Sequence, residues 1–101
     1  MVVAEIAVVP VGTGSPSVSR YVADCVKVLE ESGLKYEVTA MGTIVEGDLD
    51  AVLVAARQMH LAPFAAGAQR VVTTVKIDER RDRELSIEGK VAAVARQMGE
   101  G

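Results

Sequence analysis

Aromatic residues are scarce in this chain of 101 residues: it has no tryptophan, and its only aromatic residues are Tyr21, Tyr36 and Phe64. Half of the residues are nevertheless hydrophobic, so a packed core must be built from Val, Ala, Leu, Ile and Met. We expect a single domain over residues 1–101, because the length matches one ordinary domain. Small domains bury a smaller share of their surface than large ones, and such a chain gains from burying more in an oligomer.

Cysteine is also nearly absent, since Cys25 is the only one. A single thiol excludes an internal disulfide and a cysteine-based zinc site. Cys25 lies within an apolar run, which favours a buried, inert thiol over a nucleophile. We expect neither a metal site nor a cofactor.

No strong excess of charge is present, since the net charge is −3 and the signs are mixed along the chain. This pattern gives no electrostatic footprint for nucleic acid. No apolar stretch is long enough to cross a membrane, and the N-terminus, with Glu5 and no basic segment, does not resemble a signal peptide. We expect a cytoplasmic protein without nucleic-acid or membrane partners.

Hydrophobic periodicity predicts four strands and three helices. The strands are expected at residues 2–11, 35–41, 43–46 and 70–78, and the helices at 17–32, 49–62 and from about Ser86 onward. Ser15 or Ser17 is expected to cap the first helix, with Pro16 in its first turn and Gly33 at its end. Asp48 is expected to cap the second helix and Pro63 to stop it.

This order, β-α-β-β-α-β-α, contains two βαβ units with a hairpin between them. It predicts an α+β fold: a ferredoxin-like βαββαβ sandwich with a four-stranded antiparallel sheet and an additional C-terminal helix. Both crossover helices should cover one face of the sheet. The third helix has an apolar stripe, Ile87, Val91, Val94 and Met98, that must dock somewhere.

The other face of the sheet is predicted to be unusually apolar. It would carry Val2 or Val3, Ala7 or Val8, Val9, Met41, Val72 and several threonines. Four strands cover roughly 400 Å², and exposed apolar patches of that size usually mark contact sites. We therefore expect two copies to pack sheet on sheet, the alternative being a monomer with a Val-rich sheet.

Motifs for catalysis are weak. The segment Gly12-Thr13-Gly14 matches neither a Walker loop nor a Rossmann fingerprint and is most simply a turn. His60, the only histidine, is interpreted as a structural, hydrogen-bonded residue. No acid–base pair or nucleophile has a specific spacing, and a ferredoxin-like fold alone implies no chemistry. We expect no enzymatic activity; turnover abolished by His60→Ala would indicate otherwise.

A candidate ligand segment runs from Met41 to Gly47. Gly42 allows a ligand or a partner to approach the backbone closely. Glu46 can accept hydrogen bonds from an amino-substituted ring or offset a cation. The alternative is that Glu46 is a surface residue at a strand end.

Several segments together resemble the thiamine-binding YkoF-like family of small conserved proteins. The resemblance covers nearly the whole chain and rests on these segments in order: Val9–Thr13, Ser15 with Ser17–Val22, Gly33–Glu37, Met41–Thr43 with Glu46–Asp48, Arg70–Asp78 and Arg80–Asp82. It implies a ferredoxin-like fold, dimers through the sheet faces and often tetramers.

The resemblance further implies a non-catalytic protein that binds thiamine or its hydroxymethylpyrimidine portion near the subunit interface. Carried over by position, the ligand-contacting residues are Thr43, Glu46, Ser19, Thr13, Glu37 and Met41. An alternative is a structural or regulatory homo-oligomeric module without a small-molecule ligand. Separately, the Arg80-Arg81 loop could meet an anion such as a phosphate.

Overall fold

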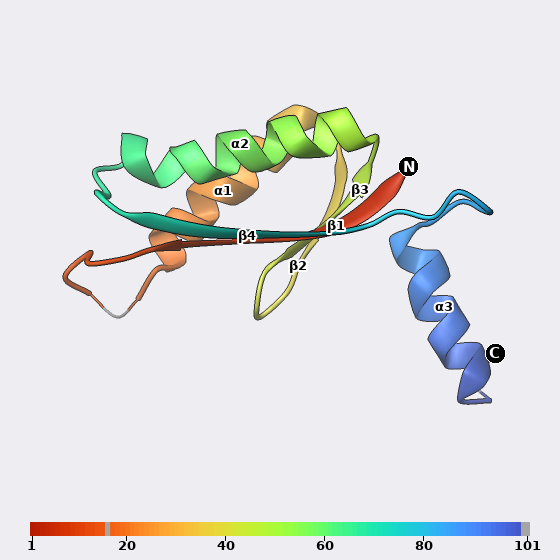
Figure 1. The fold of residues 1–101 in the computed structure, drawn as a ribbon. Helices are drawn as coiled ribbons and strands as arrows, with labels where there is room; N and C mark the ends of the chain where they lie inside the picture. The colour runs from red at the N-terminus through yellow and green to blue at the C-terminus, as the bar shows by residue number, and fades with distance from the viewer. Residues whose placement is uncertain (16, 100–101) are drawn as a thin grey trace.

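A computed structural model describes residues 1–15 and 17–99, and it confirms the ferredoxin-like α+β fold. The elements are β1 (Val2–Pro10), α1 (Ser19–Ser32), β2 (Lys35–Val38), β3 (Thr43–Gly47), α2 (Leu49–Ala65), β4 (Val71–Asp78) and α3 (Ile87–Gln97). The strands form one antiparallel sheet in the order β2-β3-β1-β4. Helices α1 and α2 cover one face, and α3 lies on the opposite side (Figure 1).

Strand β1 supplies both faces of the sheet with apolar side chains. Its alternate residues Val2, Ala4 and Ile6 are buried under α1 and α2, where they join the main core. The helices contribute Cys25, Leu29, Val52, Ala55, Ala56 and Met59 to that core. On the other face, Val3 packs with Leu85, Ile87 and Ile44 in a smaller cluster.

The face without α1 and α2 is less apolar than the sequence predicted. The register places Val3, Ala7 and Val9 there, not Val2 or Val8, with Val72 beside Val9. Six charged residues share this face by the same alternation: Glu5, Lys35, Glu37, Glu46, Lys76 and Asp78. The exposed apolar area is therefore concentrated around Val9 and Val72, which are both about half exposed.

The helix ends differ in detail from the predicted ones. Helix α1 begins at Ser19 after Val18, without a side-chain cap, so neither Ser15 nor Ser17 caps it; Pro16 lies outside the described residues. Gly33 ends α1 in the left-handed conformation, as expected. Asp48 occupies the predicted N-cap position of α2, although its side chain makes no capping hydrogen bond.

Pro63 does not stop α2, which continues to Ala65. A proline within a helix removes one backbone donor and so leaves the carbonyl four residues earlier without its partner. That carbonyl belongs to Met59, and the Cys25 thiol donates to it at 3.4 Å. The thiol of α1 thus occupies the place of the missing helical donor.

Helix α3 is held to the sheet only at its start. Ser86 caps it by accepting a hydrogen bond from the Gly89 N–H at 2.9 Å. The Ile87 N–H donates to Glu46 Oε1 at 2.9 Å. Ion pairs of Lys35 with Glu88 and of Lys90 with Asp78 add to this attachment. Beyond this first part, the stripe Val91, Val94 and Met98 is exposed.

We expect Glu46→Ala to loosen the first turn of α3. The Ile87 amide would exchange with solvent about tenfold faster, because a hydrogen bond to a charged group contributes roughly 1.5 kcal/mol. Hydrogen exchange followed by NMR measures this, with Glu37→Ala as the matched control on the same sheet face. Unchanged exchange at Ile87 would show that Glu46 does not anchor the helix.

Candidate ligand-binding site

One edge of β1 is open over part of its length. Strand β1 pairs with β3 only from Val2 to Ile6, where Ile6 lies opposite Thr43. Its pairing with β4 continues to Pro10. Residues 7–9 therefore have a strand partner on one side only. In this register the N–H and C=O of Ala7 and Val9 face β4, so those of Val8 face the open side and are available for hydrogen bonding.

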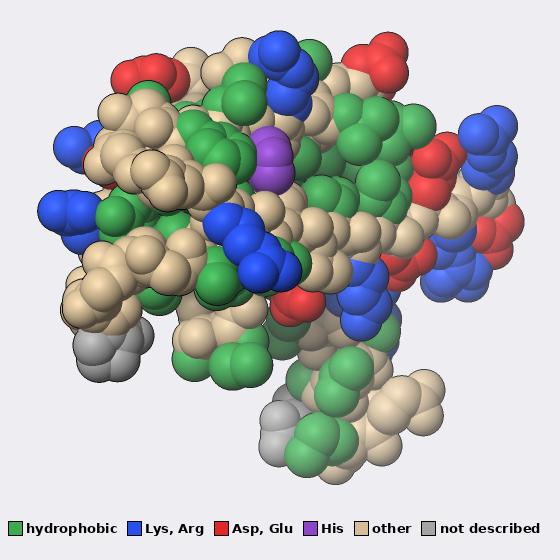
Figure 2. Space-filling model, turned by 60° about the vertical axis from the view of Figure 1, so that its left-hand side comes forward, with side chains coloured by type: hydrophobic (Ala, Val, Ile, Leu, Met, Phe, Trp, Pro, Cys, Tyr) green, Lys and Arg blue, Asp and Glu red, His purple; other side chains and the backbone are tan. Residues whose placement is uncertain are grey.

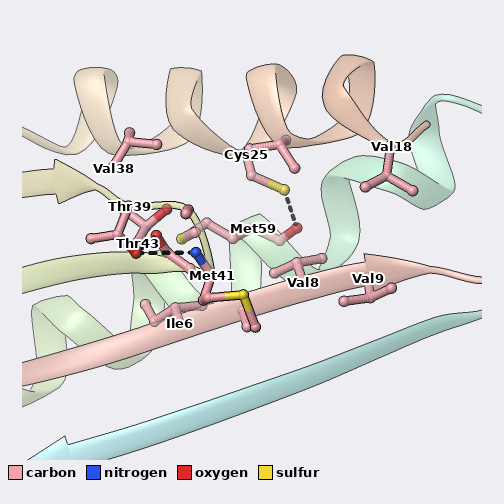
Figure 3. A pocket seen from close by; sticks show the side chains of 14 residues that line it. Ile6, Val8, Val9, Val18, Cys25, Val38, Thr39, Met41, Thr43 and Met59 are labelled. Carbon is pink, nitrogen blue, oxygen red and sulfur yellow. Dashed lines mark hydrogen bonds between the residues drawn. The ribbon is translucent and has the colours of Figure 1, made fainter.

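A cavity of about 290 Å³ lies beside this open edge. It is enclosed by the N-terminal half of α1, the buried face of α2 and the turn between β2 and β3 (Figure 3). Its lining comprises Ile6, Ala7, Val8, Val9, Val18, Val22, Cys25, Val38, Thr39, Ala40, Met41, Gly42, Thr43 and Met59. The volume is at the lower end of the roughly 300–1,000 Å³ found for small-molecule sites.

The turn between β2 and β3 forms one wall of the cavity and is held by Thr39. The Thr39 N–H and hydroxyl both donate to the Gly42 carbonyl, each at 2.8 Å. The hydroxyl also accepts from the Met41 N–H at 3.4 Å (Figure 3). This network fixes the backbone of the turn and leaves the Met41 side chain 85% exposed at the rim.

Thr43 is the polar side chain best placed to meet a ligand inside the cavity. It is only 4% exposed and lies on the helix-covered face of β3. Among the residues that the structure describes, the Thr43 hydroxyl has no hydrogen-bond partner. Every fully buried side-chain oxygen or nitrogen of these residues has such a partner, so the Thr43 hydroxyl is not fully buried. Thr43 belongs to the lining of the cavity, which makes its hydroxyl a candidate to bind a ligand there.

The other lining groups are neutral. None of the fourteen lining side chains carries a formal charge, and two of them, Met41 and Met59, are thioethers. Burial, together with the negative charge of Asp24, raises the pKa of the Cys25 thiol to about 11. The thiol is thus protonated at neutral pH, which suits its role as a donor to the Met59 carbonyl and makes it a poor nucleophile.

The structure brings two of the six predicted ligand residues, Thr43 and Met41, to the cavity. The other four lie outside its lining. Glu46 and Glu37 are on the opposite sheet face, and the Glu46 carboxylate already binds the Ile87 N–H. Thr13 and Ser19 lie in or next to the loop before α1, where the Thr13 hydroxyl donates to the Ser15 carbonyl and the hydroxyls of Ser19 and Ser17 are hydrogen-bonded.

Sequence reasoning missed the apolar walls of the site. Val18, Val22 and Cys25 follow the helical stripe of α1, which is the usual signature of core residues. Met59 belongs to the corresponding stripe of α2. A helical stripe of apolar residues does not show which of its members face a cavity. Only the three-dimensional structure places these four residues in the cavity wall.

Other sequence candidates lie away from the cavity. His60 Nδ1 is 2.7 Å from the Thr73 hydroxyl, and its ring meets Phe64 edge-on with 5.5 Å between centroids. Arg80 and Arg81 are paired with Asp82 and Glu79. Within residues 1–15 and 17–99, no cluster of His, Cys, Asp and Glu could hold a metal ion, and no helix is both long and apolar enough to cross a bilayer.

Comparison with known proteins shows that the sequence matches one protein family. Residues 4–95 match the family described as thiamine-binding protein. A UPF0045 protein of Bacillus subtilis (strain 168) is 40% identical, over 97% of this chain and 98% of its own length. A UPF0045 protein of Methanocaldococcus jannaschii is 45% identical, over 92% of this chain and 91% of its own length.

Solved structures show the same fold. A crystal structure of a hypothetical protein of Methanocaldococcus jannaschii has a TM-score of 0.85 and 43% identity, covering 99% of this chain and 97% of that one. A candidate thiamine biosynthesis or salvage protein of Thermotoga maritima has a TM-score of 0.76 and 26% identity, covering 92% of this chain and 97% of that one. The match over nearly the whole sequence shows that this chain belongs to the thiamine-binding protein family.

Proposed function

We propose that this protein binds the hydroxymethylpyrimidine portion of thiamine, without catalysis, in the cavity beside the open edge of β1. The observation that carries this proposal is the combination of a neutral cavity of about 290 Å³ with an unpaired strand edge. Membership of the thiamine-binding family supports the ligand class.

An aminopyrimidine matches the chemistry of this cavity. Its exocyclic amine and ring nitrogens place donors and acceptors along one edge of a flat ring, as a strand does along its own edge. The N–H and C=O of Val8 can pair with that edge, and the Thr43 hydroxyl can bind a further polar group. The thioethers of Met41 and Met59 can contact the ring, a favourable interaction of about 0.3–1.5 kcal/mol.

The pyrimidine fits the cavity better than the thiazolium ring of thiamine does. The thiazolium is a cation, and the lining offers no carboxylate to offset its charge. Burying an unpaired charge is costly. We therefore place the pyrimidine inside and, when the ligand is whole thiamine, the thiazolium at the rim near the exposed Met41.

The proposal excludes catalysis because the cavity lacks suitable acid–base groups. Cys25 is the only ionisable side chain in the lining, and its pKa of about 11 keeps it neutral. A general acid or base works best with a pKa near the operating pH. Binding without turnover is the function that these side chains support.

We also propose that a second copy covers the sheet face opposite α1 and α2. The exposed patch around Val9 and Val72 lies there, and exposed apolar patches commonly mark protein contacts. Because Ala7 and Val9 also line the cavity, such a contact would lie next to the ligand.

Isothermal titration calorimetry with hydroxymethylpyrimidine and with thiamine tests the ligand proposal. We expect binding of hydroxymethylpyrimidine, weakened about tenfold by Thr43→Val because the hydroxyl is lost while the shape is kept. Val22→Phe should abolish binding by filling the cavity. Glu37→Gln, on the opposite face, is the matched control and should bind normally. No heat with either compound, or equal affinity for all variants, would contradict the proposed site.

Alkylation of Cys25 gives an independent test of the same site. The raised pKa of about 11 means that reaction with iodoacetamide should be slow at pH 7 and should accelerate as the pH rises toward 11, because only the thiolate reacts. At pH 9, saturating hydroxymethylpyrimidine should slow the reaction further by covering the thiol. Mass spectrometry measures the modified fraction; an alkylation rate that the ligand leaves unchanged would place the ligand elsewhere.

A further inference from the structure

Two methionines line the cavity, and they differ sharply in their exposure to water. Met59 of α2 is 1% exposed and belongs to the inner wall, whereas Met41 is 85% exposed at the rim. Figure 3 shows both side chains, with Met41 on the turn between β2 and β3. A small oxidant dissolved in water can therefore reach one thioether of this cavity and is kept from the other.

The turn that carries Met41 is fixed by its backbone. Thr39 binds the Gly42 carbonyl through its N–H and its hydroxyl, and the Met41 N–H donates to the Thr39 hydroxyl. Gly42 also lies tight against β1, since a Cβ on it would come within 3.3 Å of the Ile6 carbonyl oxygen. None of these contacts uses the Met41 side chain. A chemical change at its sulfur would therefore leave the turn in place and alter only the rim of the cavity.

We propose that Met41 is an oxidation site that controls ligand binding, because conversion of its thioether to the sulfoxide weakens the binding of hydroxymethylpyrimidine. This inference rests on the proposed function, since it concerns the same cavity. The oxidant is a peroxide. A lone pair of the sulfur attacks one peroxide oxygen, and the S–O bond forms as the O–O bond breaks. The other oxygen leaves as hydroxide and takes the proton of the new S–OH group to become water, so that the sulfur loses two electrons and the peroxide gains them.

Oxidation changes the property that suits Met41 to the rim. A thioether makes favourable contacts with an aromatic ring, whereas a sulfoxide is polar and its oxygen binds water strongly. A ring whose face covers that oxygen removes its water and offers no donor in return, which is costly. The lost contact and the lost hydration act in the same direction, so the affinity for the pyrimidine falls.

Binding and oxidation oppose each other at this residue. A ring that lies against Met41 shields the sulfur from peroxide, so a bound ligand should slow the oxidation that in turn weakens its binding. Methionine sulfoxide reductases convert the sulfoxide back to the thioether, which makes the loss of binding reversible. Cys25, the other oxidisable sulfur of the lining that lies beside Met59, is buried and protonated at neutral pH and therefore reacts slowly.

The chain offers an internal control far from the cavity. Met98 is 69% exposed and directly follows α3, which carries exposed hydrophobic side chains and projects from the body of the molecule (Figure 2). It is nearly as open to peroxide as Met41 but does not belong to the lining of the cavity. Its oxidation should therefore leave ligand binding unchanged.

Peptide mass spectrometry after limited treatment with hydrogen peroxide tests the selectivity of the reaction. We expect Met41 and Met98 to be oxidised at least about tenfold faster than Met59, because both are exposed. Saturating hydroxymethylpyrimidine should slow the oxidation of Met41 at least about threefold and leave that of Met98 unchanged. Oxidation of Met41 at the same rate with and without the ligand would overturn the proposal.

Calorimetry with the oxidised protein tests the effect on binding, under conditions that leave Met59 reduced. Oxidised wild type should bind hydroxymethylpyrimidine about fivefold more weakly, and sulfoxide reductases should restore the affinity. Met41→Leu keeps an apolar side chain of similar size, so its binding should be the same before and after peroxide. Met98→Leu is the matched control and should lose affinity on oxidation as the wild type does. Circular dichroism should show no unfolding in any sample.

The results separate this inference from the proposed function. Equal affinity of oxidised and untreated wild type, or a loss of binding that Met41→Leu does not prevent, would overturn the role of Met41 and leave the ligand site standing. An untreated protein that binds neither hydroxymethylpyrimidine nor thiamine would overturn the proposed function, and the role of Met41 with it.

Discussion

The incomplete pairing of β1 is the constraint on which the rest of the structure depends. Over Val2–Ile6 the strand has a partner on each side and buries its alternate residues under α1 and α2. After Ile6 it keeps only β4, because β3 begins at Thr43 and the chain before it turns away. The first half of β1 thus builds the core, and the second half leaves a strand edge with free hydrogen-bonding groups beside a cavity of about 290 Å³.

The inner wall of that cavity depends on a compensation between two helices. Pro63 lacks the N–H that would bind the Met59 carbonyl within α2, and the Cys25 thiol of α1 supplies a donor instead. The donor must be the protonated thiol, and the raised pKa of Cys25, about 11, keeps it protonated well above neutral pH. Cys25 and Pro63 are far apart in the sequence but act together. The hydrogen bond from the Cys25 thiol to the Met59 carbonyl joins α1 to α2 next to the cavity, and it does so without a charged group.

Much of the fold could be predicted from the sequence, because alternation in the strands and helical stripes directly encode which face is buried. The positions of Gly33 and Asp48 at helix ends were predicted for the same local reasons. Pro63 was misjudged because its compensating donor lies 34 residues away from its partner carbonyl in sequence. Of the candidate ligand residues, Thr43 and Met41 line the cavity, whereas Glu46 belongs to the attachment of α3, a long-range contact that no local pattern reveals.

An NMR titration of isotope-labelled protein with hydroxymethylpyrimidine is the most direct test of where the ligand binds. We expect the largest shift changes in the amides of Ala7, Val8 and Val9 and in the methyl groups of Met41 and Met59. The methyl groups of Ile44 and Ile87, on the opposite face of the sheet, should change little. Changes centred on Ile44 and Glu46, or none at all at saturating ligand, would contradict a pyrimidine site at the open edge of β1.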